Sequence, residues 1–170
     1  TFEKIVSLDE NYLFNVDQRV INNSKKSFDL FPYGLSKRQG IPEMQNFFIL
    51  HEGPMSVTEG VLEEYDYDDL KDRKKIESNS VGGWIGMTDK YWQTAIIPNQ
   101  NEPIKQTYRY NFVENIDNFQ TDLRGAKIIV GSGDDISHNL KLFAGPKIVS
   151  IIEQYMDEHG VQEFDRSVDF

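Results

Sequence analysis

Residues 82–98 constrain the fold of this chain more than any other stretch of its sequence. The segment opens on two glycines, closes on Pro98, and contains both tryptophans of the chain, Trp84 and Trp92, separated by a polar turn at Thr88-Asp89. Apolar runs bounded by turn residues are typical of strands, and large aromatic side chains are mostly buried. We therefore expect two buried strands joined by a turn, with Trp84 and Trp92 both in the core.

The composition indicates one sheet-rich domain spanning residues 1–170. A chain of 170 residues can bury a substantial core, and its 11 Phe and 8 Tyr favour sheets over a helical bundle. Mean hydropathy is -0.56, and no apolar run reaches the length of a membrane span. The sequence starts at Thr1 without an initiator Met or an apolar leader, so we expect a processed chain or a fragment of a longer protein.

The charge and the cysteine count exclude several function classes. The formal net charge is -10, which disfavours nucleic acid and broad adhesion to anionic lipid, because both need clustered Lys and Arg. The sequence has no cysteine, so disulfides, thiolate metal sites and cysteine nucleophiles are excluded.

The first half of the sequence predicts strands. Residues 2–6 lead to a turn at 9–11, and near-alternation of apolar and polar residues predicts a strand that ends at Val20-Ile21. The polar residues 22–26 then predict a hairpin connection to a second extended stretch, residues 27–35.

Three further features belong to the middle of the chain. Pro32 interrupts the second extended stretch, which predicts an edge position or a bulge. Residues 47–50 predict a short buried strand closed by residues 51–54. The acidic stretch 59–75 predicts a surface hairpin and loop, with a short helical turn near its end.

The second half predicts more strands and then one helix. Strands are expected at residues 106–112, 126–130 and 139–143, with a loop at 99–103 and a turn at 131–135. Pro146 and Gly160 occupy positions typical of a first-turn proline and a helix-terminating glycine. Between them an apolar stripe falls at i, i+3, i+4, i+7 and i+8, and it consists of Ile148, Ile151, Ile152, Tyr155 and Met156.

No motif in the sequence supports catalysis, a cofactor or a metal. The histidines His51, His138 and His159 are far apart and lack metal-ligand spacing. The acidic run starting at Asp66 has Lys71 where a calcium loop requires glycine. The chain contains no G-x-S-x-G, P-loop or H-E-x-x-H, so we expect a protein that is not an enzyme.

Five pieces of sequence carry a family resemblance, and they follow one another in the order that the family has. They are residues 64–70; residues 82–98; residues 107–112 with 119–125; residues 142–147; and residues 165–170. Together they resemble the periplasmic domain of the YidC family of bacterial membrane protein insertases, over essentially the whole chain.

The resemblance implies an all-β fold, a β-supersandwich of the galactose mutarotase type with a C-terminal amphipathic helix. It implies a periplasmic location between the first and second transmembrane helices of an inner-membrane protein, with the chain ending just before the second. The family domain has further strands before Phe2, so this chain is expected to be truncated at its N-terminus, with an unpaired edge strand.

The resemblance also implies partners and a role. The parent inserts and folds membrane proteins, alone or with the Sec translocon, so Sec components and nascent membrane proteins are the expected partners. Its working groove inside the membrane is absent from this chain. A helix that precedes a membrane span can set the orientation of the domain only if it is rigidly docked, so we expect a bracing helix. The expected structural and interaction residues are Gly83, Trp84, Tyr91, Trp92, Gly145, Pro146, Ile148, Ile151, Ile152, Tyr155 and Met156.

Two other function classes stay open at this point. A carbohydrate-binding or mutarotase-like module would place an exposed Trp92 in a groove that also holds a His and a Glu, although fold analogy is a weak argument for function. A soluble interaction domain without a membrane connection is the third class.

Overall fold

The structure is a computed structural model that describes residues 1–42 and 50–168, whose strands form three antiparallel sheets. The largest sheet has seven strands in the order β1-β2-β13-β9-β8-β5-β6. In that order the strands are β1 (Phe2–Leu8), β2 (Leu13–Ile21), β13 (Asp135–Pro146), β9 (Trp92–Ile97), β8 (Trp84–Thr88), β5 (Gly53–Thr58) and β6 (Val61–Glu64).

Two smaller sheets accompany it. The four-stranded sheet has the order β4-β11-β10-β7, formed by β4 (Tyr33–Gln39), β11 (Ile116–Gly125), β10 (Pro103–Val113) and β7 (Lys75–Val81). The third sheet pairs β3 (Phe28–Leu30) with β12 (Ile128–Val130). The helices are α1 (Tyr67–Arg73), α2 (Val149–His159) and the short 3-10 helix η1 (Phe164–Ser167).

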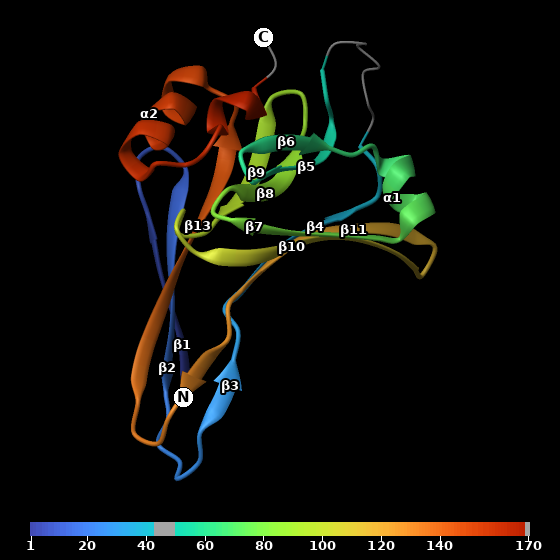
Figure 1. Ribbon diagram of the computed structural model, residues 1–170. Helices are drawn as coiled ribbons and strands as arrows, with labels where there is room; N and C mark the ends of the chain where they lie inside the picture. The colour runs from blue at the N-terminus through green and yellow to red at the C-terminus, as the bar shows by residue number, and fades with distance from the viewer. Residues whose placement is uncertain (43–49, 169–170) are drawn as a thin grey trace.

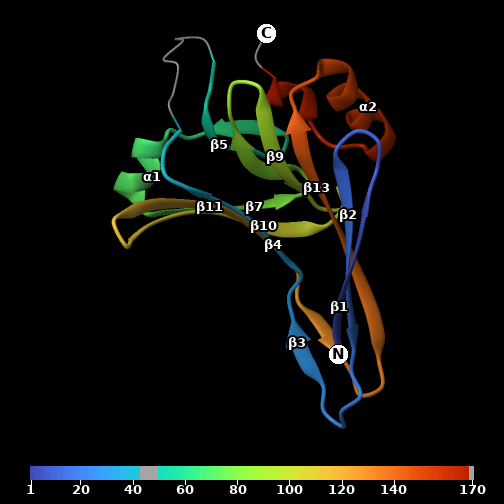
Figure 2. The ribbon, with the colours of Figure 1, turned by 180° about the vertical axis from the view of Figure 1, so that it is seen from behind.

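The elements stack in layers (Figure 1). The four-stranded sheet lies against one face of the seven-stranded sheet. Helix α2 lies against the other face, near one end of the molecule. The long strands β1, β2 and β13 extend beyond the sandwich toward β3, at the end opposite α2, as the reverse view also shows (Figure 2). β1 lies at an edge of the seven-stranded sheet.

Each face of the seven-stranded sheet has its own core. The core between the sheets contains Tyr67, Leu70, Ile85, Met87, Ile96, Ile104, Tyr108, Phe119, Leu123 and Leu140. The core under the helices contains Leu13, Met55, Val57, Trp84, Ala95, Ile97, Phe143, Ile152, Tyr155, Val161 and Phe164. Neighbouring residues of β8 and β9 alternate between the two cores, as the two-residue period of a strand requires.

Glycines allow β8 to lie close to its neighbours. A Cβ on Gly86 would meet the carbonyl oxygen of Thr94 at 1.8 Å, and one on Gly83 would meet that of Val57 at 2.1 Å. Gly83 also has φ of +78°, a conformation that L side chains rarely adopt. The glycine-rich start of the tryptophan segment is therefore required by backbone packing.

One buried polar side chain joins the two sheets. Gln106 of β10 donates from Nε2 to the carbonyl oxygens of Val57 and Trp84, at 3.1 and 3.0 Å. Its Oε1 accepts from the Thr58 hydroxyl at 2.7 Å. The amide is thus satisfied in a core where an unpaired polar group would be costly.

Many of the predicted elements are confirmed. The first hairpin, the strand end at Ile21, the loop before β10 and the turn between β12 and β13 lie where the sequence placed them. The tryptophan segment forms the β8–β9 hairpin, closed by a hydrogen bond from the Asp89 amide to the Trp92 carbonyl at 2.7 Å. The acidic stretch contains the turn and the second strand of the β5–β6 hairpin, followed by the helix α1.

Other predictions were wrong. Residues 22–26 do not connect a hairpin, because β3 pairs with β12 rather than with β2. Pro32 lies between β3 and β4, so it marks no bulge; of the two predicted alternatives the edge position agrees better, because β4, which follows Pro32, is an edge strand. Residues 51–54 were expected to close a strand, but Gly53 and Pro54 begin the fully buried strand β5. The strand expected at residues 47–50 falls almost wholly outside the described residues.

Strand β7 was not predicted, and β11 only as part of a connection. The acidic stretch is also less exposed than expected, since Tyr67 and Leu70 of α1 point into the core between the sheets.

Candidate functional site

Helix α2 begins later than the sequence predicted. Pro146 is the last residue of β13 and pairs with Trp92, so it is not a first-turn proline. Ile148 is the N-cap residue, and the helix starts at Val149. At the other end Gly160 adopts the left-handed conformation with φ of +61°, which confirms the predicted helix stop.

The apolar stripe divides into buried and exposed members. Ile152 and Tyr155 are fully buried, and Ile151 and Met156 are partly buried against the same core. Ile148 is 43% exposed. The stripe therefore docks α2 on the sheet through its middle and later members, because the first member lies at the start of the helix beyond the core.

A hydrogen-bonded carboxylate fixes the buried tyrosine of α2. The Tyr155 hydroxyl donates to Asp9 Oδ2 at 2.6 Å, and Asp9 Oδ1 accepts from the amides of Leu13 and Asn11 at 2.8 and 2.9 Å. Burial alone would raise the pKa of the Asp9 carboxyl, but these hydrogen bonds together lower it. Burial, with the neighbouring Asp9, raises the pKa of the Tyr155 hydroxyl. The pair ties the β1–β2 turn to α2.

The tail after α2 continues the docking surface. Phe164 is fully buried, with edge-to-face contacts to Trp84 at 5.5 Å and to Phe143 at 5.7 Å between ring centroids. Trp84 Nε1 donates to the carbonyl of Gln162 at 3.1 Å. Trp84 is a core residue, as predicted, and it contacts Phe164 and Gln162 of the C-terminal tail.

Gly145 admits an aromatic ring beside this surface. A Cβ at Gly145 would meet Tyr12 side-chain carbons at 2.7 and 2.8 Å. The Ala144 amide also donates to the Tyr12 carbonyl at 3.1 Å, so the β1–β2 turn folds over the end of β13. A larger residue at position 145 would push Tyr12 away from this contact.

Trp92 is not in the core, contrary to the prediction. It is 56% exposed, and Tyr91 beside it is 65% exposed. Because side chains alternate along a strand, Trp92 lies on the same face of β9 as Thr94. The hydroxyl oxygen of Thr94 is 3.2 Å from that of Ser36 in β4. Trp92 lies two residues nearer the β8–β9 turn, at the start of β9.

A polar hollow contains a His–Glu pair but not Trp92. His138 Nε2 lies 2.8 Å from Glu102 Oε2, in a hollow of about 760 Å³ that Asn99, Gln100 and His159 also line. His138 precedes Pro146, the strand partner of Trp92, by eight residues of β13. That distance is about 26 Å along the strand. The arrangement expected of a sugar-binding groove is therefore absent from this hollow.

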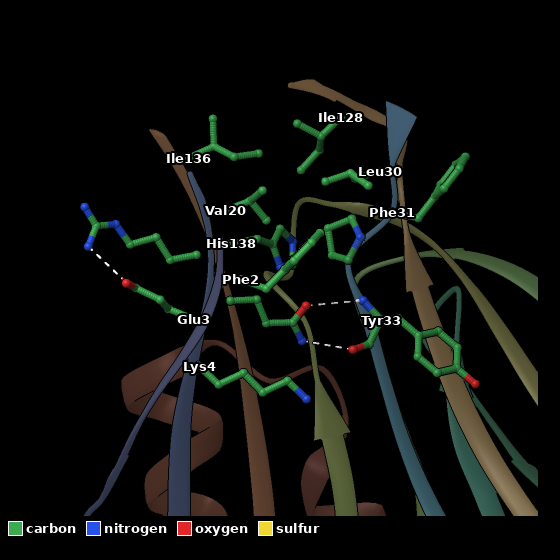
Figure 3. A pocket seen from close by; sticks show the side chains of 13 residues that line it. Phe2, Glu3, Lys4, Val20, Leu30, Phe31, Tyr33, Ile128, Ile136 and His138 are labelled. Atoms are coloured by element: carbon green, nitrogen blue, oxygen red, sulfur yellow. Dashed lines mark hydrogen bonds and ion pairs between the residues drawn. The ribbon is translucent and has the colours of Figure 1, made fainter. Parts of the chain in front are cut away.

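An apolar cleft lies at the end opposite α2 (Figure 3). One wall comes from the long strands, with Phe2, Val20 and Ile136, and the other from β3 and β12, with Leu30 and Ile128. Its volume is about 220 Å³. Two hydrogen bonds between the Gln18 side chain and the Tyr33 backbone, 2.9 and 3.5 Å long, cross one side of it. The cleft can hold a small apolar group.

Two classes of feature are missing from the part of the chain that the structure describes. In residues 1–42 and 50–168 no helix is long and apolar enough to span a membrane. Over the same residues, no group of three or more His, Asp and Glu side chains could hold a metal ion.

Comparison with solved structures defines the fold class. The structure aligns with one described as an aldose 1-epimerase from Klebsiella pneumoniae, with a TM-score of 0.55. The alignment covers 95% of this chain and 51% of that one, at 9% sequence identity. The domain is thus a β-sandwich of the galactose mutarotase-like class, as predicted, with a docked C-terminal helix.

Sequence comparison then gives the family. The model of the YidC periplasmic domain matches residues 1–170. Membrane protein insertases YidC from Rickettsia canadensis and Rickettsia africae are 38% and 36% identical to the chain over 167 residues. The alignments cover 97% of this chain and 30% of each relative. The chain belongs to the YidC periplasmic-domain family, which confirms the resemblance and the periplasmic location and speaks against the carbohydrate-binding alternative.

Sequence reasoning missed several residues of the docking surface. Phe164 and Gln162 lie beyond the helix, where no periodicity marks them. Asp9 stands in a turn, 146 residues before its partner Tyr155, and gave no signal of that contact.

Proposed function

We propose that this domain is a non-catalytic scaffold of a membrane protein insertase, and that α2 and η1 brace it against the membrane-embedded part of the parent. The whole protein would insert and fold membrane proteins, alone or beside the Sec translocon. This chain spans 30% of the length of its relatives. Its role would be to set the orientation of the domain and to provide partner contacts, rather than to carry out the insertion step.

The docked tail is the observation that supports this proposal. Ile152, Tyr155 and Phe164 are buried in one core with strands β2, β5, β8, β9 and β13. Burying such side chains stabilises a structure by roughly 1.5–3 kcal/mol each. A tail held this firmly can pass the orientation of the sandwich to whatever segment follows it.

The proposal places the C-terminal end of the domain toward the membrane. Residues 165–170 resemble the stretch that precedes the second transmembrane helix of the family. The Gln93 side chain donates to the Ser167 hydroxyl at 3.0 Å, so the end of η1 is fixed to the start of β9. The orientation of the sandwich would therefore be transmitted to the following segment over a short and rigid path.

The first test removes the docking of α2. Ile152→Asp and Tyr155→Asp should lower the melting temperature of the domain and impair growth that depends on the full-length parent. Glu153→Ala, on the exposed side of the same helix, is the matched control. Normal melting and growth for both Asp variants would refute the proposal.

A second test separates bracing from folding. A flexible Gly-Gly-Ser insertion after Val168 should leave the melting temperature unchanged but reduce function of the parent, because the domain stays folded while its orientation is lost. The same insertion after Gly133, in an exposed turn, is the control. If both insertions leave the parent fully active, rigid coupling is unnecessary.

A further inference from the structure

Exposed apolar side chains gather where β9 begins and β13 ends. Tyr91 and Trp92 are more than half exposed, and Ile148 at the start of α2 is 43% exposed. Backbone pairing joins them, because Trp92 pairs with Pro146 and the Lys147 amide donates to the Tyr91 carbonyl at 2.8 Å. We name Tyr91, Trp92 and Ile148 the aromatic end.

The C-terminal tail lies at the same end of the molecule. Gln93, next to Trp92, holds Ser167 of η1. In both views the β8–β9 turn and the red C-terminal segment lie together at the top, and β3 lies at the bottom (Figures 1 and 2). Whatever the tail approaches, the aromatic end approaches too.

The residue types of the aromatic end suit one kind of surface. Trp and Tyr are enriched where the acyl chains of a bilayer meet the headgroups, because their rings are apolar and their polar atoms stay hydrated. Lys90 Nζ lies 5.0 Å from the centroid of the Tyr91 ring.

Electrostatic attraction of the domain as a whole cannot supply this contact. The net charge of -10 opposes general adhesion to anionic lipid. The contact therefore depends on the aromatic rings, and a tether must hold the domain at the surface, since tethering raises the effective concentration of a weak contact.

We infer that the aromatic end sits in the headgroup layer of a phospholipid bilayer, with the rings of Tyr91 and Trp92 at the boundary with the acyl chains. The inference rests on the proposed function, which turns the C-terminal end toward the membrane, and it names the surface that touches lipid.

Tryptophan fluorescence provides the test. The chain, with a hexahistidine tag after Phe170, is held on phosphatidylcholine vesicles that contain a nickel-chelating lipid. Trp84 is buried, so the difference between the unchanged chain and Trp92→Phe reports Trp92. We expect a blue shift of that emission, and its quenching when the acyl chains carry bromine. Tyr91→Ser should weaken both effects, and Ile129→Ser, in β12 at the opposite end, should not.

A tag before Thr1 provides the orientation control and should abolish the quenching. Equal Trp92 emission on brominated and unbrominated vesicles with the C-terminal tag, or equal quenching with either tag, would overturn the inference. If Trp92 stays unquenched while the parent still requires a docked α2, only the lipid contact is wrong and the bracing role stands. If the Asp variants of α2 leave the parent unaffected, the bracing role fails whatever the fluorescence shows.

Discussion

Replacing Ile152 by alanine tests the division of the apolar stripe most directly. Ile152 is fully buried in the core that contains Tyr155 and Phe164, whereas Ile148, another isoleucine of the same stripe, is 43% exposed. Truncating a buried isoleucine to alanine costs about 2–5 kcal/mol, since the surrounding core collapses only partly into the space. An exposed truncation usually changes stability by about 0.5 kcal/mol or less.

Thermal unfolding converts these energies into a measurable difference. For a domain of this size 1 kcal/mol shifts Tm by about 2–4 °C, so Ile152→Ala should lower it by about 4–20 °C. Ile148→Ala should lower it by about 2 °C at most. Circular dichroism gives Tm, and urea unfolding followed by tryptophan emission gives the free energy of unfolding. Equal losses for the two variants would refute the assignment of α2 as docked through Ile152.

Three further predictions follow from particular contacts. Tyr155→Phe should cost about 1 kcal/mol at neutral pH, because a hydrogen bond to a partly exposed carboxylate is lost. Since the pKa of Asp9 is lowered by folding, that contribution is present above the ordinary value of 3.8 and disappears as pH falls through the lowered pKa. The free energies of unfolding of the unchanged chain and of Tyr155→Phe, measured in urea, should therefore become equal at acid pH. A difference that stays constant with pH would contradict the Asp9 contact. Gly86→Ala should destabilise the domain by several kcal/mol or prevent folding, as its Cβ would overlap the Thr94 carbonyl; an unchanged Tm would show that β8 and β9 can separate. Gln106→Met should lower the free energy of unfolding in urea by about 1–3 kcal/mol, because the carbonyls of Val57 and Trp84 lose the donor that Gln106 supplies, and a neutral result would mean that water replaces the amide.

Local chemistry made some parts of this protein predictable. Gly160 marks the end of α2 because only glycine adopts the left-handed turn there without strain. The turns at residues 9–11 and 131–135 are readable from their polar composition, and the family resemblance of the separated pieces pointed to the mutarotase-like sandwich. These features depend on a few neighbouring residues.

Other parts depend on which layer lies over which strand. Trp84 and Trp92 stand in one hairpin, yet Trp84 contacts Phe164 of the tail, whereas Trp92 is 56% exposed. Pro146 has the features of a helix start but pairs as a strand because Trp92 lies opposite it. No local pattern distinguishes these outcomes.

The sequence by itself determined the class of fold, the positions of most turns, the presence of a terminal amphipathic helix and the family. Tertiary structure alone decided which members of the stripe are buried, that Asp9 receives the Tyr155 hydroxyl across 146 residues, and that Tyr91 and Trp92 remain outside. The physical reason is that periodicity specifies a face of a helix or strand, whereas burial requires a partner that the chain supplies from a distant segment.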